Sequence, residues 1–186
     1  MHIVRLSTAT RGDGLEMSEK KQTKFSTRLV AVLGLLIAVT VVISMWFIIP
    51  VPMTHGNINL CDAGIFIAAL LFGRRGGAIV GGASGFLLDL LSGYSQYMLF
   101  SLIVHGLEGF LVGQFGADQS KGRQFMAITI GGVVMVIGYF ISDTILYAMP
   151  TGLAGVPTNA IQAVVGGVIA YPIVLRLKDR VKTQFN

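Results

Sequence analysis

Three ionisable side chains interrupt an otherwise apolar, glycine-rich stretch of this sequence. Residues 77–116 contain Asp89, His105 and Glu108 in two apolar segments, on either side of an uncharged turn at 92–97. At membrane depth an ionisable side chain costs roughly 3 kcal/mol or more unless it contacts water or a partner. His105 and Glu108 are spaced i, i+3 and therefore share one helix face. The pattern favours a pair that hydrogen-bonds a polar ligand, and the alternative is a buried pair with a purely structural role.

Other polar residues fall toward the same end of the apolar segments. Asn159 and Gln162 repeat the i, i+3 spacing, and such amides either contact a ligand or join two helices. Tyr139 and Asp143 lie in the corresponding half of their own segment. Together these residues predict a polar cup that is open to one side of a membrane, with Glu108 near its floor.

The composition is that of a protein embedded in a membrane. The chain has 186 residues, of which 53% are hydrophobic and 12% are charged, and its mean hydropathy is +0.73. Soluble domains carry about 25% charged residues, so we predict a polytopic, multi-pass membrane protein. The single cysteine, Cys61, excludes an intrachain disulfide and gives no metal cluster. We expect no metal and no cofactor.

The apolar segments predict an all-α fold of six transmembrane helices. We expect them at about 28–49, 60–72, 77–91, 97–115, 124–148 and 158–175, with a turn at 73–76 and loops at 53–59 and 149–157. The second and third are shorter than the ~20 residues that cross a bilayer, so we expect them to pack within the bundle. The membrane domain then covers 28–177, between a polar tail at 1–27 and a basic tail at 178–186. Residues 1–16 are either an upstream extension or an expression remnant.

The basic residues predict the orientation of these helices. All fourteen lysines and arginines fall before the first helix, in the 73–76 turn, between the fourth and fifth helices, or after the sixth. The positive-inside rule then places both termini in the cytoplasm and the cup on the outer side. Asp62 and Asp89 lie near the outer ends of their helices, where we expect them to cap or brace. The net charge of +5 is thus a topology signal, and we exclude nucleic acid as a partner.

Small residues spaced four apart predict close contacts between helices. The glycines repeated at this spacing in 77–85 and 109–113 favour packing inside the bundle. Gly34 and Ala38 have the same spacing in a helix that carries no ionisable residue after Arg28, so this helix is not needed to line the cup. Its small face is a candidate for binding another subunit.

Two alternative functions fit parts of the pattern. Residues 82–85 read Gly-Ala-Ser-Gly, which matches the Gly-x-Ser-Gly of rhomboid-type intramembrane serine proteases, and His105 follows on the next helix. A proton-coupled secondary carrier is the second alternative, although six helices in 186 residues leave no obvious inverted repeat. The sequence has no Gly-x-x-x-x-Gly-Lys-Ser/Thr loop, so the chain does not hydrolyse ATP by that route. We predict that the chain is not an enzyme.

Five short motifs in this chain resemble those of a known family. They are Gly34-x-x-x-Ala38, the Ile-Pro-Val-Pro of 49–52, the Leu-Cys-Asp-Ala-Gly-Ile-Phe of 60–66, the Asp-Leu-Leu-Ser-Gly-Tyr of 89–94 and the His-Gly-Leu-Glu-Gly of 105–109. Through them the chain resembles the substrate-binding S components of energy-coupling factor (ECF) vitamin transporters, and within that superfamily the hydroxymethylpyrimidine and pyridoxine group. The resemblance covers about residues 30–165.

The resemblance implies a bacterial plasma-membrane subunit that captures a small heterocyclic vitamin or precursor outside the cell and delivers it inside. Such a subunit works with a transmembrane coupling subunit, the T component, and two cytosolic ATPases. Six helices, cytoplasmic termini and an outer pocket closed by the loop at 50–59 are also implied. Gly34 and Ala38 would face the coupling subunit, although the first position is usually alanine. The position of His105 is often basic in this group, and a histidine there makes the charge pH-dependent.

Aromatic side chains near the cup would stack on a flat heterocycle. The residues predicted to bind substrate are His105, Glu108, Asn159, Gln162, Tyr139, Asp143, Tyr97 and Tyr94. Trp46 and Tyr147 are further aromatic candidates.

Overall fold

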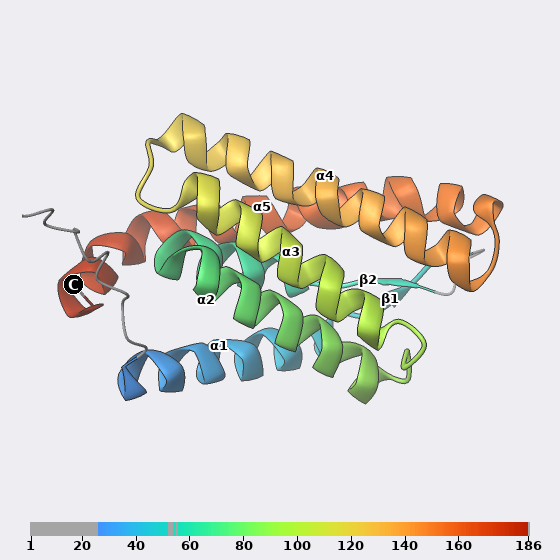
Figure 1. Cartoon of the computed structure of the whole chain (residues 1–186), viewed down its shortest axis with the longest axis horizontal. Coiled ribbons are helices and arrows are strands. Elements are labelled where there is room, and N and C mark those ends of the chain that lie inside the picture. The colour runs from blue at the N-terminus through green and yellow to red at the C-terminus, as the bar shows by residue number, and fades with distance from the viewer. Residues whose placement is uncertain (1–25, 52–53, 55, 186) are drawn as a thin grey trace, which may run out of the picture.

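The computed structural model describes residues 26–51, 54 and 56–185 of the chain. Within these residues the chain forms five helices and one two-stranded antiparallel sheet (Figure 1). The elements in order are α1 (Thr27–Trp46), β1 (Ile49–Pro50), β2 (Asn57–Ile58), α2 (Cys61–Ser92), α3 (Met98–Gly116), α4 (Lys121–Leu146) and α5 (Met149–Phe185). By length and composition each helix can cross a membrane, which confirms the all-α membrane class. Most of the predicted polar tail, residues 1–25, lies outside the described residues.

The two short helices predicted at 60–72 and 77–91 lie on the single element α2, which breaks at Gly73. Gly73 has φ 70° and ψ −169°, a conformation that is accessible almost only to glycine. A Cβ atom added at Gly81 would lie 3.3 Å from Ile65 Cγ2, whereas these positions would be about 24 Å apart along a straight helix. Leu88 likewise packs with Cys61 and Ile65. The two arms of α2 therefore run antiparallel, and the predicted four-residue turn is reduced to one non-helical residue.

Glycines bring α3 into backbone contact with the second arm of α2. A Cβ atom added at Gly77 would overlap the carbonyl oxygen of Gly109, and one at Gly81 would overlap the carbonyl oxygen of His105. No larger residue fits there unless the helices separate, because the overlapping atoms belong to backbone. The predicted packing role of these small residues is confirmed, and the contact fixes the position of His105 relative to α2.

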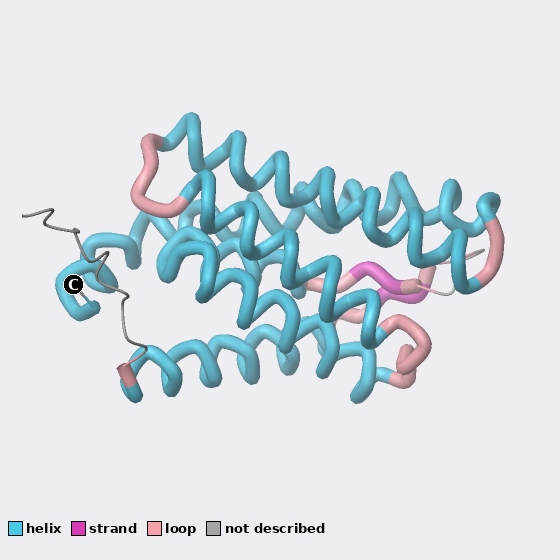
Figure 2. Tube along the Cα trace, in the orientation of Figure 1, coloured by secondary structure: helices cyan, strands magenta, loops and turns pink. Residues whose placement is uncertain are grey.

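A short β-hairpin connects α1 to α2, toward the end of the bundle that carries the α4–α5 turn (Figure 2). α1 ends at Trp46, and Ile49 and Pro50 then pair with Ile58 and Asn57. Pro50 is compatible with this pairing because both strands of a two-stranded sheet are edge strands. Part of the segment predicted as a loop therefore has regular structure and leads directly into α2.

The prediction of a loop at 149–157 is wrong, because α5 already begins at Met149. Pro150 occupies the first turn, where the missing N–H removes no helical hydrogen bond. Gly152 allows the segment to pack tightly on α4, since an added Cβ atom would lie 2.6 Å from the carbonyl oxygen of Phe140. This packing outweighs the cost of Pro157 inside the helix. At its other end α5 continues to Phe185, so the predicted basic tail is helical up to that residue.

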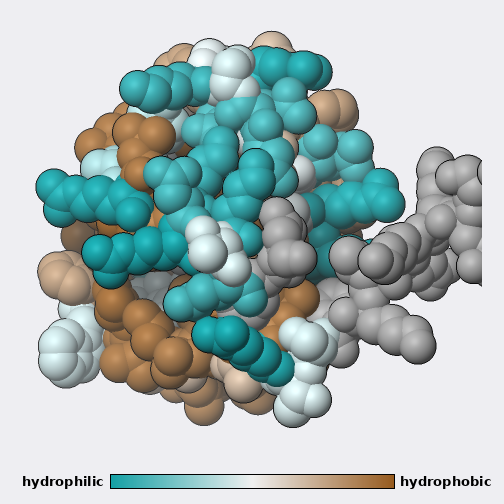
Figure 3. Space-filling model, turned by 90° about the vertical axis from the view of Figure 1, so that its left-hand side faces the viewer, coloured by the Kyte–Doolittle hydropathy of each residue, from teal (hydrophilic) through white to brown (hydrophobic). Residues whose placement is uncertain are grey.

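The basic residues of the described chain share one end of the bundle. They lie at the start of α1, just after the break in α2, at the start of α4 and in the last turns of α5. Contacts between these segments confirm their proximity: Arg28 Nη2 donates to Gln184 Oε1 (3.3 Å), and Lys182 Nζ is 4.0 Å from Asp118 Oδ1. Hydrophilic side chains cover this end, with apolar side chains around much of its rim (Figure 3). The basic residues therefore lie at one end of the bundle, as the sequence predicts. The location of that end in the cytoplasm stays a prediction.

Candidate functional site

A polar pocket lies beneath the β1–β2 hairpin. Its volume is about 40 Å³, which is room for a few water molecules. The lining residues are Val51, Thr54, Gly56, Asn57 and Asn59 from the hairpin segment, Asp89, Tyr97, Tyr139 and Asp143 from the bundle, and Gly155, Thr158, Asn159 and Gln162 from α5. Residues that are far apart in the sequence thus converge where the hairpin covers the helix ends.

Asn59 ties the hairpin to the helices below it. Its backbone N–H donates to Gln162 Oε1 on α5 (2.8 Å), and its side-chain Oδ1 accepts from the backbone N–H of Cys61 at the start of α2 (2.8 Å). The side-chain amide of Asn59 also donates to Asn57 Oδ1 on β2 (2.9 Å). Asn59 was not predicted as a site residue, although an asparagine just before a helix is a common capping signal. Asn59 therefore connects the hairpin directly to Gln162 on α5.

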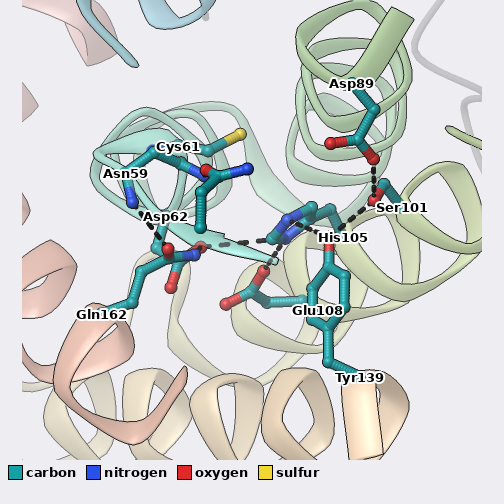
Figure 4. A network of polar contacts seen from close by, with 10 residues as sticks. Asn59, Cys61, Asp62, Asp89, Ser101, His105, Glu108, Tyr139 and Gln162 are labelled. Atoms are coloured by element: carbon teal, nitrogen blue, oxygen red, sulfur yellow. Dashed lines mark hydrogen bonds and ion pairs between the residues drawn. The ribbon is translucent and has the colours of Figure 1, made fainter. Parts of the chain in front are cut away.

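Beneath the pocket, His105 is the centre of a second, fully buried polar layer (Figure 4). Its Nδ1 lies 2.7 Å from Glu108 Oε2 and 3.8 Å from Asp62 Oδ1. Its Nε2 lies 2.9 Å from the hydroxyl of Tyr139. Gln162 Nε2 donates to Asp62 Oδ1 (3.2 Å). The spacing-based prediction that His105 and Glu108 face one another therefore matches the geometry.

Three further hydrogen bonds organise the pocket walls. The hydroxyl of Ser101 donates to Asp89 and lies 2.6 Å from the hydroxyl of Tyr139. The hydroxyl of Tyr97 donates to Asp143 Oδ1 (2.6 Å). Burial, together with the carboxylate of Asp143, raises the pKa of Tyr97 well above its usual range. Tyr97 therefore keeps its proton and acts as a donor at neutral pH.

The predicted substrate-binding residues fall into two groups. Five of them line the pocket, namely Tyr97, Tyr139, Asp143, Asn159 and Gln162. His105 and Glu108 lie one layer below and contact each other. His105 reaches the lining residue Tyr139 directly, and it reaches the lining residue Gln162 through Asp62. Tyr94 is half-buried in the α2–α3 turn and is not part of the lining. Trp46 is 83% exposed, and the ring of Tyr147 packs 6.3 Å from that of Tyr97.

Asp62 and Asp89 belong to this site, beyond the bracing role that we predicted for them. Asp89 lines the pocket, and Asp62 contacts both His105 and Gln162. Both aspartates reach the same site because α2 folds back on itself at Gly73, which returns its last turn to the level of its first. The predicted turn at 73–76 already places both aspartates near the same side of the membrane, but the sequence carries no signal that they reach one site.

The geometry gives the serine protease alternative no support. Ser84 Oγ is buried and has no hydrogen-bond partner among the described residues. Both ring nitrogens of His105 are engaged, one by Glu108 and the other by Tyr139. A serine nucleophile requires a base within hydrogen-bond reach.

The small face of α1 is exposed in the part of the chain that the structure describes. Gly34 and Ala38 are both exposed, and a Cβ atom added at Gly34 would have no other heavy atom of the described chain within 4 Å. The opposite face of α1 carries its buried residues, which include Leu33 and Val41. The predicted interface residues are therefore available to a partner helix.

Comparison with known proteins agrees with this architecture. The family model of the ECF-type riboflavin transporter, S component, matches residues 24–179. The chain belongs to this family. It is accordingly a multi-pass plasma-membrane protein and the substrate-binding subunit of an ECF-type importer, as the sequence motifs indicated. Membership favours this function over the proton-coupled carrier and the intramembrane protease, and it points to a transport component rather than an enzyme.

Two individual proteins are also similar to this chain. The thiamine precursor transporter HmpT of Lactococcus lactis subsp. cremoris (strain MG1363) is 43% identical over 134 residues, which are 72% of this chain and 77% of HmpT. An uncharacterized protein of Pyrococcus woesei, described as lying in the gap 3′ region, is 36% identical over 145 residues, which are 77% of this chain and 97% of that protein.

Proposed function

We propose that this S component captures a small, flat vitamin precursor of the hydroxymethylpyrimidine type, with pyridoxine-like compounds as the nearest alternative. The observation that carries the proposal is the 43% identity to HmpT, which is named as a thiamine precursor transporter. The identity extends over 134 residues, which is long enough to include most of the membrane bundle.

The chemistry of the pocket supports this class of ligand. Asn159 and Gln162 supply amides that both donate and accept, as the ring nitrogens, amino group and hydroxyl of a substituted pyrimidine require. Tyr97 and Tyr139, with ring centroids 6.4 Å apart, offer aromatic surface beside these amides. The cavity holds only a few water molecules, so we infer that the hairpin shifts outward to admit a substituted pyrimidine and closes over it. The hydrogen bond from Asn59 to Gln162 would transmit that closure.

We further propose six membrane spans, with both termini in the cytoplasm. The two arms of α2 would count as separate spans, because Gly73 reverses the chain between them. The positive-inside rule assigns the basic end to the cytoplasm, and the pocket then opens outward. The first arm, 61–72, extends only about 18 Å at the helical rise, so the surrounding helices must shield it from lipid.

Partner subunits complete the proposed transport cycle. The loaded protein docks on a transmembrane coupling subunit through Gly34 and Ala38 of α1. Two cytosolic ATPases drive the complex, and the bundle tilts in the membrane to release its ligand inside the cell. The exposure of Gly34 and Ala38 in the described chain, with open space beside Gly34, supports this docking mode.

The test is to identify and then measure the ligand. Mass spectrometry of small molecules released from the purified protein should show a hydroxymethylpyrimidine, and titration calorimetry should give saturable binding of that compound in preference to pyridoxine and riboflavin. Asn159→Ala should weaken binding, because a lost hydrogen bond typically reduces affinity about tenfold. Thr129→Ala, on the exposed face of α4, is the matched control. Preferential binding of riboflavin, or equal binding by Asn159→Ala, would contradict the proposal.

A further inference from the structure

Three buried side chains below the pocket can share one ion. Asp62, His105 and Glu108 each offer a ligand atom, and these atoms all lie within 4.8 Å of one another. The exposed fractions of the three residues are 0%, 2% and 0%. Asp62 Oδ2 and Glu108 Oε1 are buried without a hydrogen-bond partner in the described part of the chain. Figure 4 shows the three side chains pointing toward a common centre.

A chain of hydrogen bonds fixes which nitrogen of His105 carries its proton. Ser101 donates its hydrogen to the carboxylate of Asp89, so its oxygen can only accept from Tyr139, 2.6 Å away. Tyr139 then has no hydrogen left for His105 and must accept from Nε2, 2.9 Å away. The opposite assignment would leave the oxygens of Ser101 and Tyr139 in contact without a hydrogen between them. Neutral His105 is therefore protonated on Nε2, and its Nδ1 carries a lone pair.

When both carboxylates are ionised, this tautomer leaves three acceptor atoms facing one another. Nδ1 of His105 lies 2.7 Å from Glu108 Oε2 and 3.8 Å from Asp62 Oδ1. His105 is also the one basic side chain in the described residues within 4.0 Å of either carboxylate. A proton between Nδ1 and Glu108 Oε2 satisfies their hydrogen bond, but Asp62 Oδ2 and Glu108 Oε1 still have no partner among the described residues. Buried carboxylates are paired or coordinate a metal.

We propose that Asp62, His105 and Glu108 bind one divalent transition-metal ion, such as Zn²⁺, in a site that is distinct from the vitamin pocket. One imidazole nitrogen with carboxylate oxygens is a donor set for first-row divalent ions. Ligand bonds of 2.0–2.2 Å place neighbouring donors about 3.3–3.5 Å apart. Rotation of the Glu108 carboxylate, which has one free oxygen, and a small inward shift of Asp62 would reach that spacing.

The surrounding contacts match those of a supported metal site. A ligating histidine usually donates its second N–H to an oxygen acceptor, and Tyr139 occupies that place for His105. Ligating carboxylates are themselves hydrogen-bonded, as Asp62 is by Gln162. Because Tyr139 and Gln162 also line the pocket, an ion would reach the triad from the pocket side and would fix the pocket floor.

The experiment measures metal binding by the full chain in detergent, without added vitamin. After treatment with EDTA and removal of the chelator, titration with Zn²⁺ should show one saturable site per chain, and Co²⁺ should give visible absorption bands of a low-symmetry complex.

Asp62→Asn, Glu108→Gln and His105→Gln should each weaken Zn²⁺ binding by about tenfold or more. Tyr139→Phe, which removes the acceptor of the Nε2 proton, should weaken it about tenfold as well. Asp118→Asn, an exposed carboxylate at the basic end, is the matched control and should bind as the parent protein does.

Several outcomes would overturn the proposal. They are the absence of saturable binding to the parent protein, equal binding by all three triad variants, or an unchanged melting temperature of the parent protein in saturating Zn²⁺. The last measurement needs no variant, so it decides the matter even if a substituted chain fails to fold. Vitamin binding is a separate readout: its absence both in EDTA and in saturating Zn²⁺ would contradict the proposed transport function without bearing on the metal site.

Discussion

At the scale of residues, the site consists of two polar layers joined by Tyr139 and Gln162. Each of these side chains lines the pocket on one side and contacts the buried triad on the other. A ligand that displaces either side chain would therefore alter the contacts of His105 or Asp62. This arrangement makes the lower layer a support for the binding surface.

Sequence spacing could predict part of this arrangement. The i, i+3 relation of His105 and Glu108 depends only on helix geometry, and the two side chains do meet, 2.7 Å apart. The separation of the site into layers depends on how far Tyr139 and Gln162 reach from α4 and α5, which is set by helix packing. Local spacing carries no information on that distance, so the sequence alone groups His105 and Glu108 with the lining residues.

Glu108→Ala should weaken vitamin binding by about 10–100-fold. The substitution removes a buried, charge-assisted contact with His105 that is worth about 1.5–3 kcal/mol, and it frees the ring that positions Tyr139 in the pocket wall. Titration calorimetry in EDTA measures the effect without any contribution from bound metal. Gln114→Ala, on the exposed basic end of the same helix, is the control. Unchanged affinity in folded Glu108→Ala protein would show that the lower layer does not support the pocket.

At the scale of elements, two glycine-dependent features determine where the site residues lie. Gly73 reverses α2 and returns Asp89 to the level of Asp62. The glycines of α2 and α3 then bring the two backbones together. The sequence indicated both features through its short apolar segments and small-residue spacing. It misassigned 149–157, because the local proline and glycine content favours a loop and only packing on α4 stabilises the helix there.

Gly81→Ala should destabilise the bundle and displace His105. The added Cβ atom would overlap the His105 carbonyl oxygen, so α2 and α3 must separate. Overpacking of this kind costs about 1–3 kcal/mol. Thermal unfolding in detergent should therefore show a lower melting temperature, accompanied by weaker vitamin binding. Gly122→Ala makes the same chemical change where the described chain places no atom of another element within 4 Å of the added Cβ atom, and it should be neutral or slightly stabilising. Equal melting temperatures for the two variants would contradict the backbone contact.

At the scale of the whole molecule, binding and docking occupy different surfaces. The pocket is built by the hairpin, α4, α5 and the ends of α2 and α3. The described residues of α1 contribute no side chain to its lining, and their small face points away from the bundle. The sequence could predict that the basic residues share one end, because this follows from which connections between successive spans carry lysine and arginine. The free face of α1 required the structure, since small residues serve internal and external contacts equally well.

Gly34→Leu combined with Ala38→Leu should separate binding from transport. Small residues let a partner helix approach the backbone closely, and in lipid this packing drives association. Two leucines on this face would hold the partner helix away, at a cost of about 1–3 kcal/mol. Vitamin affinity in detergent should stay within about twofold, because neither residue contacts the pocket. Co-purification with the coupling subunit and uptake by cells should both be lost.

Val164→Leu combined with Val168→Leu, on the exposed face of α5, should retain both. If the α1 variant instead assembled normally and lost vitamin binding, α1 would belong to the binding site and the coupling subunit would have to dock elsewhere.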